Sequence, residues 1–218
     1  MKIKWCGHAT FLITSSSGLK IVTDPYEPGG YDGALAYGPI PDEINIAVVS
    51  HDHPDHNYTQ GLKGKPQVVK GTGTKAVVGI EFKGIPTYHD TSQGKERGKS
   101  TIFCFTVDKV RLCHLGDLGH PLSSKEIAEI AEVDVLMIPV GGFYTVDAKV
   151  ATEVMNSLKP RLVIPMHFKT DKCGFPITTV DGFIAGKKNV KKLTTSELEV
   201  TKDNLPPLTE IQVLQFAM

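Results

Sequence analysis

The sequence predicts a mixed α/β domain whose first half is mostly antiparallel β and whose second half alternates strands with helices. As far as residue 114, short β-branched and aromatic runs are separated by Gly, Pro, Ser and Asp, which is typical of strands joined by turns. Beyond Gly116-Asp117, apolar residues recur at helical spacing between buried strands. The 218 residues, 40% of them hydrophobic, suffice for one sizeable core. No linker divides them, so one domain over residues 1–218 is expected.

The elements of the first half are expected to be short strands at residues 3–6, 10–14, 19–23, 44–49, 67–70, 77–82, 85–88, 101–107 and 110–114. Ser15-Ser16-Ser17-Gly18 and Asp108-Lys109 supply the turns of two hairpins. Residues 26–43 are rich in Gly, Pro and Tyr and predict a long loop. Long loops within compact domains are often functional.

The second half predicts helices that start at polar capping residues. Ser123 or Ser124 begins the first helix, and Asp147 caps a second that runs to Leu158 and is stopped by Pro160. A third, short helix is expected at residues 180–186. Buried strands are expected at residues 134–140 and 162–166, and a closing strand at 211–216.

The composition narrows the possible partners and the cellular setting. Lys+Arg and Asp+Glu are equal at 24, so the net charge gives no general case for binding nucleic acid or an anionic membrane. The basic run at residues 187–192 is expected to be a solvated surface. The four cysteines form no CxxC pair, there is no signal-peptide pattern, and no apolar run approaches the ~18 residues of a membrane span. A soluble, reducing, cytoplasmic setting is expected.

The densest group of potential metal ligands is His51-Asp52-His53-Pro54-Asp55-His56, directly after the expected strand at 44–49. Neutral imidazole is the commonest protein ligand for transition metals, and carboxylates supply charge that allows two ions to be held. Placing such groups at the end of a buried strand without a partner would cost several kcal/mol. The run therefore predicts a metal site, and a solvated His-rich turn is the alternative.

Three more potential ligands follow other expected strands. His89 follows the strand at 85–88, Asp117 the strand ending in His114, and His167 the strand at 162–166. Each alone would more often be a surface or hydrogen-bonded residue. Ligands at the ends of different strands can converge at one edge of a sheet, where a rigid scaffold fixes them.

The ligand order resembles a known signature. His51-x-His53-x-Asp55-His56, then His89, Asp117 and His167, is similar to the metal-ligand pattern of the metallo-β-lactamase-fold hydrolases. The segments 5–10, 23–25, 114–120 and 164–167 look like small prokaryotic Zn-dependent hydrolases related to ascorbate-6-phosphate lactonase. The resemblance spans almost the whole chain, and it implies a four-layer αββα sandwich with the metals at one edge.

The resemblance also implies which residues hold which ion. The first metal would be held by His51, His53 and His89, the second by Asp55, His56 and His167, and Asp117 would bridge them. Such ligands suit two zinc ions per chain, and manganese, iron and nickel are compatible with them. Two adjacent dications would deprotonate a bound water near neutral pH and polarise the scissile oxygen. Asp55 would also orient this nucleophile.

Four residues outside the ligand set are further candidates. His8 and His120 are candidate catalytic residues that could face the cleft, with a turn-capping role as the alternative for His8. Asp24 could orient a metal-bound imidazole, or it could simply form an Asp-Pro turn. Tyr144 and the backbone amides of Gly141-Gly142 could stabilise an oxyanion, although an ordinary turn is the simpler interpretation.

The expected function is metal-dependent hydrolysis of an ester, lactone or phosphoester bond in a small molecule. The resemblance favours lactone or phosphorylated substrates. The alternatives are a compact phosphodiesterase or nuclease acting on nucleic acid, and a non-catalytic metal-binding regulatory module. The sequence contains neither GxSxG nor a P-loop motif, so serine-nucleophile and nucleotide-cradling mechanisms have no support. It identifies neither the substrate nor the oligomeric state.

Overall fold

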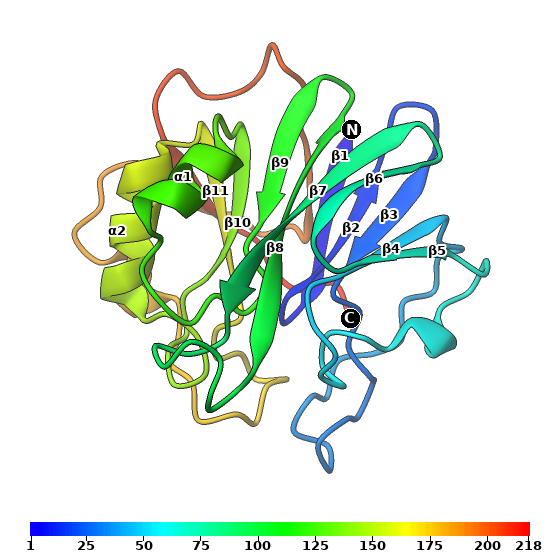
Figure 1. Cartoon of the computed structure of the whole chain (residues 1–218), viewed down its shortest axis with the longest axis horizontal. Coiled ribbons are helices and arrows are strands. Elements are labelled where there is room, and N and C mark those ends of the chain that lie inside the picture. The colour runs from blue at the N-terminus through cyan, green and yellow to red at the C-terminus, as the bar shows by residue number, and fades with distance from the viewer.

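A computed structural model describes residues 1–218 and shows two β-sheets packed face to face, with helices outside one of them (Figure 1). The six-stranded sheet has the order β13-β1-β2-β3-β4-β5 and consists of β1 Lys2–Gly7, β2 Thr10–Thr14, β3 Lys20–Thr23, β4 Ile46–Val49, β5 Gln67–Lys70 and β13 Glu197–Glu199. The eight-stranded sheet has the order β12-β14-β11-β10-β9-β8-β7-β6 and consists of β6 Gly73–Val77, β7 Ile80–Tyr88, β8 Lys99–Val107, β9 Val110–His114, β10 Val135–Pro139, β11 Leu162–Met166, β12 Val190–Lys192 and β14 Glu210–Val213.

Both faces of the central strands β2, β3 and β4 of the six-stranded sheet are buried. Successive side chains of a strand point to opposite faces. Phe11 and Ile13 of β2 therefore join the core between the two sheets, while Leu12 joins a second apolar cluster on the outer face. Tyr26, Leu35 and other residues of the loop 26–43 cover that cluster. The outermost layer on this side is thus built from a loop.

Helices α1 Ser124–Ile130 and α2 Ala148–Leu158 lie outside the eight-stranded sheet (Figure 1), and the one-turn helix α3 Asp181–Ile184 contacts α2. Ser123 and Glu126 form a capping box at the start of α1, and Asp147 caps α2 by accepting from the amide of Val150 at 2.8 Å. A 3-10 turn spans Thr59–Gly61. None of the helices has the length and apolarity needed to traverse a bilayer.

Some details differ from the sequence prediction. The strand expected at 77–82 is wrong, because Val78 and Gly79 adopt positive φ and turn the chain between β6 and β7. The first half is also less antiparallel than expected, since β4 runs parallel to both β3 and β5. The short edge strands β12 and β13 were not predicted.

The strand directions place the predicted ligands at one edge. Strand β9 is parallel to β10 and β10 to β11, while β7 and β9 are each antiparallel to β8. Strands β7, β9 and β11 therefore all end on the same side. His89, Asp117 and His167 follow these three ends, and His51 follows the end of β4 in the facing sheet.

Candidate metal centre

Four of the seven ligands predicted from the sequence surround the carboxylate of a fifth, Asp117. Its Oδ2 atom lies 3.1 Å from Nε2 of both His56 and His89, 3.4 Å from Nε2 of His167 and 3.9 Å from Nε2 of His51. These side chains come from four separate connections between elements, and all are buried. One carboxylate oxygen thus faces imidazoles from both sheets.

The predicted ligands other than Asp117 fall into two groups, and Asp24, His51 and His56 form a further set that overlaps both. One group consists of His51, His53 and His89, and the other of His8, Asp55, His56 and His167; within each group all ligand atoms lie within 4.8 Å of one another. The grouping has the same division as the sequence interpretation, with His8 added to the second group. His8 lies in the turn between β1 and β2 and is fully buried.

The buried polar atoms of this cluster fit divalent cations. Nε2 of His56, Oδ1 of Asp117 and Nδ1 of His8, His89 and His167 are buried without a hydrogen-bond partner. Leaving buried polar groups unpaired costs about 1–3 kcal/mol each, so such groups are rare unless a ligand satisfies them. Imidazole and carboxylate donors are those that zinc and similar transition metals prefer.

Asp24 organises one imidazole of each group, as the sequence suggested it could. Its Oδ2 accepts from Nδ1 of His56 at 2.9 Å and from the hydroxyl of Ser50 at 2.6 Å, while its Oδ1 accepts from the Ser50 amide at 2.7 Å. Because the Ser50 hydroxyl donates to Asp24, its oxygen accepts from Nδ1 of His51 at 2.9 Å. Both imidazoles therefore carry a proton on Nδ1 and turn Nε2 toward the other ligands, and Nε2 of His51 lies 3.0 Å from Nδ1 of His53.

The local electrostatics keep His8 and His51 neutral and Asp117 ionised, whereas Asp117 and Asp55 outweigh burial and raise the pKa of His56, so that a bound cation would replace a proton there. Burial, followed by the neighbouring His167, lowers the pKa of His8 to about 4, and burial together with His56 lowers the pKa of His51 to about 3. Burial opposes ionisation of Asp117, but His167 and His56 outweigh it and hold its pKa well below its usual range. Neutral imidazole and ionised carboxylate are the forms that bind a cation.

A cavity of about 310 Å³ opens onto this cluster, and we call it the metal cavity. Besides ligands, Tyr31, Tyr144, Phe175, Glu96 and Arg97 line it. Tyr144 was predicted from the sequence. The other four were missed, although the long loop 26–43 was the signal that could have pointed to Tyr31, whose hydroxyl donates to Oδ1 of Asp55 at 3.0 Å.

The second oxygen of Asp55 is also held. Nε2 of His8 lies 3.0 Å from Oδ2 of Asp55. The ring centroid of His8 is 4.1 Å from the ring centroid of His167. The backbone carbonyl of His8 accepts from the amide of His167 at 3.0 Å. The β1–β2 turn is therefore attached directly to the second group of ligands.

The amides of Gly141 and Gly142 cannot stabilise an oxyanion as the sequence suggested, because both already donate hydrogen bonds within the protein. The Gly141 amide donates to the carbonyl of His167 at 3.1 Å, and the Gly142 amide donates to that of Val146 at 3.3 Å. Only the hydroxyl of Tyr144 remains from that suggestion.

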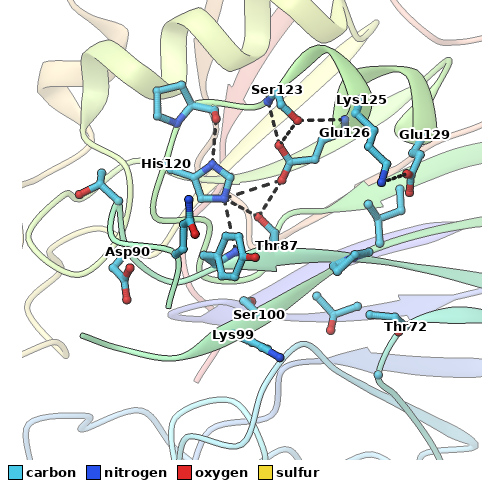
Figure 2. A pocket seen from close by; sticks show the side chains of 18 residues that line it. Thr72, Thr87, Asp90, Lys99, Ser100, His120, Ser123, Lys125, Glu126 and Glu129 are labelled. Carbon is cyan, nitrogen blue, oxygen red and sulfur yellow. Dashed lines mark hydrogen bonds and ion pairs between the residues drawn. The ribbon is translucent and has the colours of Figure 1, made fainter. Parts of the chain in front are cut away.

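His120 does not lie in the metal cavity. It lines a neighbouring cavity of about 840 Å³ between β7, β8 and α1, where its Nε2 accepts from the Tyr88 amide at 3.3 Å and lies 2.9 Å from the Thr87 hydroxyl (Figure 2). Its Nδ1 donates to the carbonyl of Pro121 at 2.8 Å. With both ring nitrogens engaged, His120 connects the Asp117 loop to the end of β7.

Comparison with known proteins agrees with this geometry. Residues 2–167 match the Beta-lactamase superfamily domain. A UPF0173 metal-dependent hydrolase of Carboxydothermus hydrogenoformans is 30% identical over 211 residues, covering 83% of this chain and 88% of that protein. A Pyrococcus abyssi metal-dependent hydrolase is 29% identical over 195 residues, covering 78% and 85%.

Solved structures show the same relationship. A Thermotoga maritima protein, described as a candidate Zn-dependent hydrolase of the metallo-beta-lactamase superfamily, is 34% identical with a TM-score of 0.78, covering 98% of this chain and 99% of that one. The short form of human tRNase Z shares the fold alone, at 10% identity and a TM-score of 0.57, with 78% and 93% of the two chains covered.

The fold and the cluster of ligands thus define a metal-dependent hydrolase. The chain belongs to the metallo-β-lactamase superfamily, and within it to the UPF0173 metal-dependent hydrolases.

Proposed function

We propose that this protein is a dinuclear zinc hydrolase that cleaves an ester, lactone or phosphoester bond of a small molecule. The observation that carries the proposal is the single Asp117 oxygen facing imidazoles of two separate ligand groups beside a cavity. The description of the Thermotoga relative as a candidate Zn-dependent enzyme supports the choice of zinc. All four cysteines are free and buried, which fits the cytoplasmic setting predicted from the sequence.

The chain supplies a complete set of ligands for two ions. His51, His53 and His89 would hold one ion, Asp55, His56 and His167 the other, and Asp117 would contact both. When bound, the two cations supply Lewis-acid polarisation of the scissile group and a water of lowered pKa.

The remaining residues orient the reacting groups. His8 and Tyr31 donate to the two oxygens of Asp55 and fix the plane of its carboxylate, which orients the attacking water. The hydroxyl of Tyr144 lies in the cavity wall, where it can donate to the oxygen on which charge develops. The ring of Phe175 lies 5.2 Å from that of Tyr31 and 5.7 Å from that of Tyr144, measured between centroids. These three rings form an aromatic wall that excludes water from one side of the metal cavity.

Metal analysis and substitution of one ligand test the proposal. Purified protein should contain close to two ions per chain by mass spectrometry, and His167→Ala should weaken the second site and abolish turnover. A folded protein that ignores added zinc, or a fully active His167→Ala variant, contradicts the proposal.

A panel of lactones, simple esters, phosphodiesters and short RNAs identifies the bond. His8→Ala should lower turnover while zinc content stays the same, since the proposed role of His8 is to orient Asp55. Loss of zinc in this variant would instead make His8 a ligand of the second group.

A further inference from the structure

A second cavity of about 720 Å³ adjoins the metal cavity. We call it the basic cavity; among the residues that line it are Lys70, Lys75, Arg97, Lys99, Asp52 and His53. His53 and Arg97 line both cavities, so the boundary between them is formed by one proposed zinc ligand and one guanidinium. A substrate whose reacting bond lies at the metals can therefore extend into the basic cavity.

The basic cavity carries four positive charges against one negative charge, in a chain whose net charge is zero. The single carboxylate, Asp52, pairs with Lys70 at 3.3 Å, and both side chains are more than half exposed. An exposed pair of this kind contributes about 0–1 kcal/mol and exchanges readily for another partner. Lys75 and Lys99 make no ion pair at all. This concentration of charge is not neutralised within the protein.

Arg97 is the only Lys or Arg side chain in the wall of the metal cavity, and the backbone of its loop is held in place. The carboxylate of Asp90 accepts the amides of Ser92, Gly94, Glu96 and Arg97 at 2.8 to 3.0 Å, which closes the loop that follows His89. The guanidinium lies 5.8 Å from the ring centroid of Tyr144 and pairs only with the exposed carboxylate of Glu96, at 3.5 Å. Its hydrogen-bonding groups are therefore largely available to a ligand.

The positive character ends beyond Lys99. The next cavity, shown in Figure 2, shares Lys99 with the basic cavity but adds the carboxylates of Asp90, Glu126 and Glu129 against one further cation, Lys125. A long polyanion that continued past Lys99 would meet these three carboxylates. The charge distribution thus fits a compact anion rather than an extended nucleic acid.

We propose that the basic cavity binds a compact anionic group, a phosphate or a carboxylate, at the far end of the substrate from the hydrolysed bond. Guanidinium groups bind both anions through paired hydrogen bonds, and lysines add point charges around them. This proposal rests on the proposed hydrolase function, because the metal cavity must hold the reacting end.

Matched substrates test the proposal by activity. A neutral ester and the same ester extended by a phosphate or a carboxylate are compared, and kcat/KM should favour the anionic members. In Arg97→Gln combined with Lys99→Gln this preference should fall at least tenfold, mainly through KM. Lys95→Gln is the matched control, because Lys95 is an exposed cation of the same loop that lines neither cavity. An unchanged preference in the double variant overturns the proposal.

Lysine footprinting tests it without turnover. The zinc-loaded full chain is reductively methylated with and without inorganic phosphate, and with acetate as the carboxylate probe. Phosphate or acetate should protect Lys70, Lys75 and Lys99 severalfold, and should leave the exposed Lys63 and Lys188 unchanged. Anion binding without this protection overturns the proposal.

Two outcomes separate this proposal from its alternatives. If no ester is hydrolysed but the three lysines are protected, the hydrolase assignment fails while the anion site stands. If RNA is cleaved in preference to the phosphorylated esters, and RNA protects the basic run at 187–192 as well, the small-molecule proposal is overturned.

Discussion

Replacing Asp24 with Asn should weaken zinc binding in both ligand groups at once. In Asp24→Asn, one oxygen can still accept from the Ser50 amide, which lies 2.7 Å from Oδ1. The new NH₂ group replaces Oδ2, which accepts from the hydroxyl of Ser50 and from Nδ1 of His56 at 2.6 and 2.9 Å. The NH₂ group of the new side chain would then face the Ser50 hydroxyl and the Nδ1–H of His56, which are both donors.

The protons can rearrange only at the expense of the metal ligands. His56 can avoid the clash by moving its proton to Nε2, which removes the lone pair that binds metal. The Ser50 hydroxyl can turn toward His51, 2.9 Å away, and that change places the His51 proton on Nε2 as well. Loss of one such outer partner typically reduces metal affinity 10–100-fold, or about 1.4–2.8 kcal/mol, and we expect the upper end because two ligands are affected.

Competition with a chromophoric chelator measures the affinity directly. Ser50→Ala keeps the bond between Asp24 and His56 and should lose only about tenfold. Asp52→Asn is the matched control, because its side chain is 68% exposed and should change zinc affinity less than twofold. The reasoning is refuted if Asp24→Asn binds zinc like the parent, or if it is already unfolded in chelator, which would make Asp24 a structural residue of the Asp-Pro turn.

Three further predictions concern stability. A Cβ atom at Gly119 would lie 2.3 Å from the backbone of His89, so Gly119→Ala should destabilise the protein by about 2 kcal/mol in urea unfolding. Burial raises the pKa of Asp108, but donors from Ser16 and the amino group of Met1 outweigh it and hold that pKa below its usual range. Because the pKa of Asp108 is lower in the folded than in the unfolded chain, the ionised carboxylate stabilises the fold above about pH 4. Asp108→Asn should therefore lower the free energy of unfolding by about 1 kcal/mol at pH 7. The difference between variant and parent should disappear as the pH falls below about 4. Chelation should lower the melting temperature by about 5–10 °C if zinc was present at about 100 times its Kd, and an unchanged melting curve would count against bound metal.

The convergence of four predicted ligands at one edge could be expected from the sequence, because His51, His89, Asp117 and His167 each lie within three residues of a strand end. Strand direction brings these ends together, while the assignment of ligands to two ions came from the family resemblance. The mixed α/β class followed from the order of elements, and the αββα sandwich followed from the resemblance carried by the His and Asp motifs.

Other parts depend on contacts that no spacing reveals. Arg97 reaches the cavity because four amides of its loop donate to the carboxylate of Asp90. The sequence Gly94-Lys95-Glu96-Arg97-Gly98 contains no pattern that predicts these bonds. His120 was predicted near the cleft, but the Tyr88 amide holds its ring in the adjoining cavity. The turn at Val78 was hidden because Val77 and Val78 resemble the middle of a strand.

The loop 26–43 covers the outer face of the six-stranded sheet with one part and lines the metal cavity with another. Its base is anchored in the outer cluster, where the hydroxyl of Tyr26 donates to the carbonyls of Cys6 and Gly38 at 3.2 and 2.9 Å. Its tip is exposed and carries Tyr31 to the metal cavity. Substitutions at the exposed residues 31–33 can therefore change which molecule is accepted while the base, with Ala34, keeps the sheet covered, and Tyr31 is retained where its hydrogen bond to Asp55 is needed. A library confined to these residues is the natural starting point for changing selectivity without loss of folding.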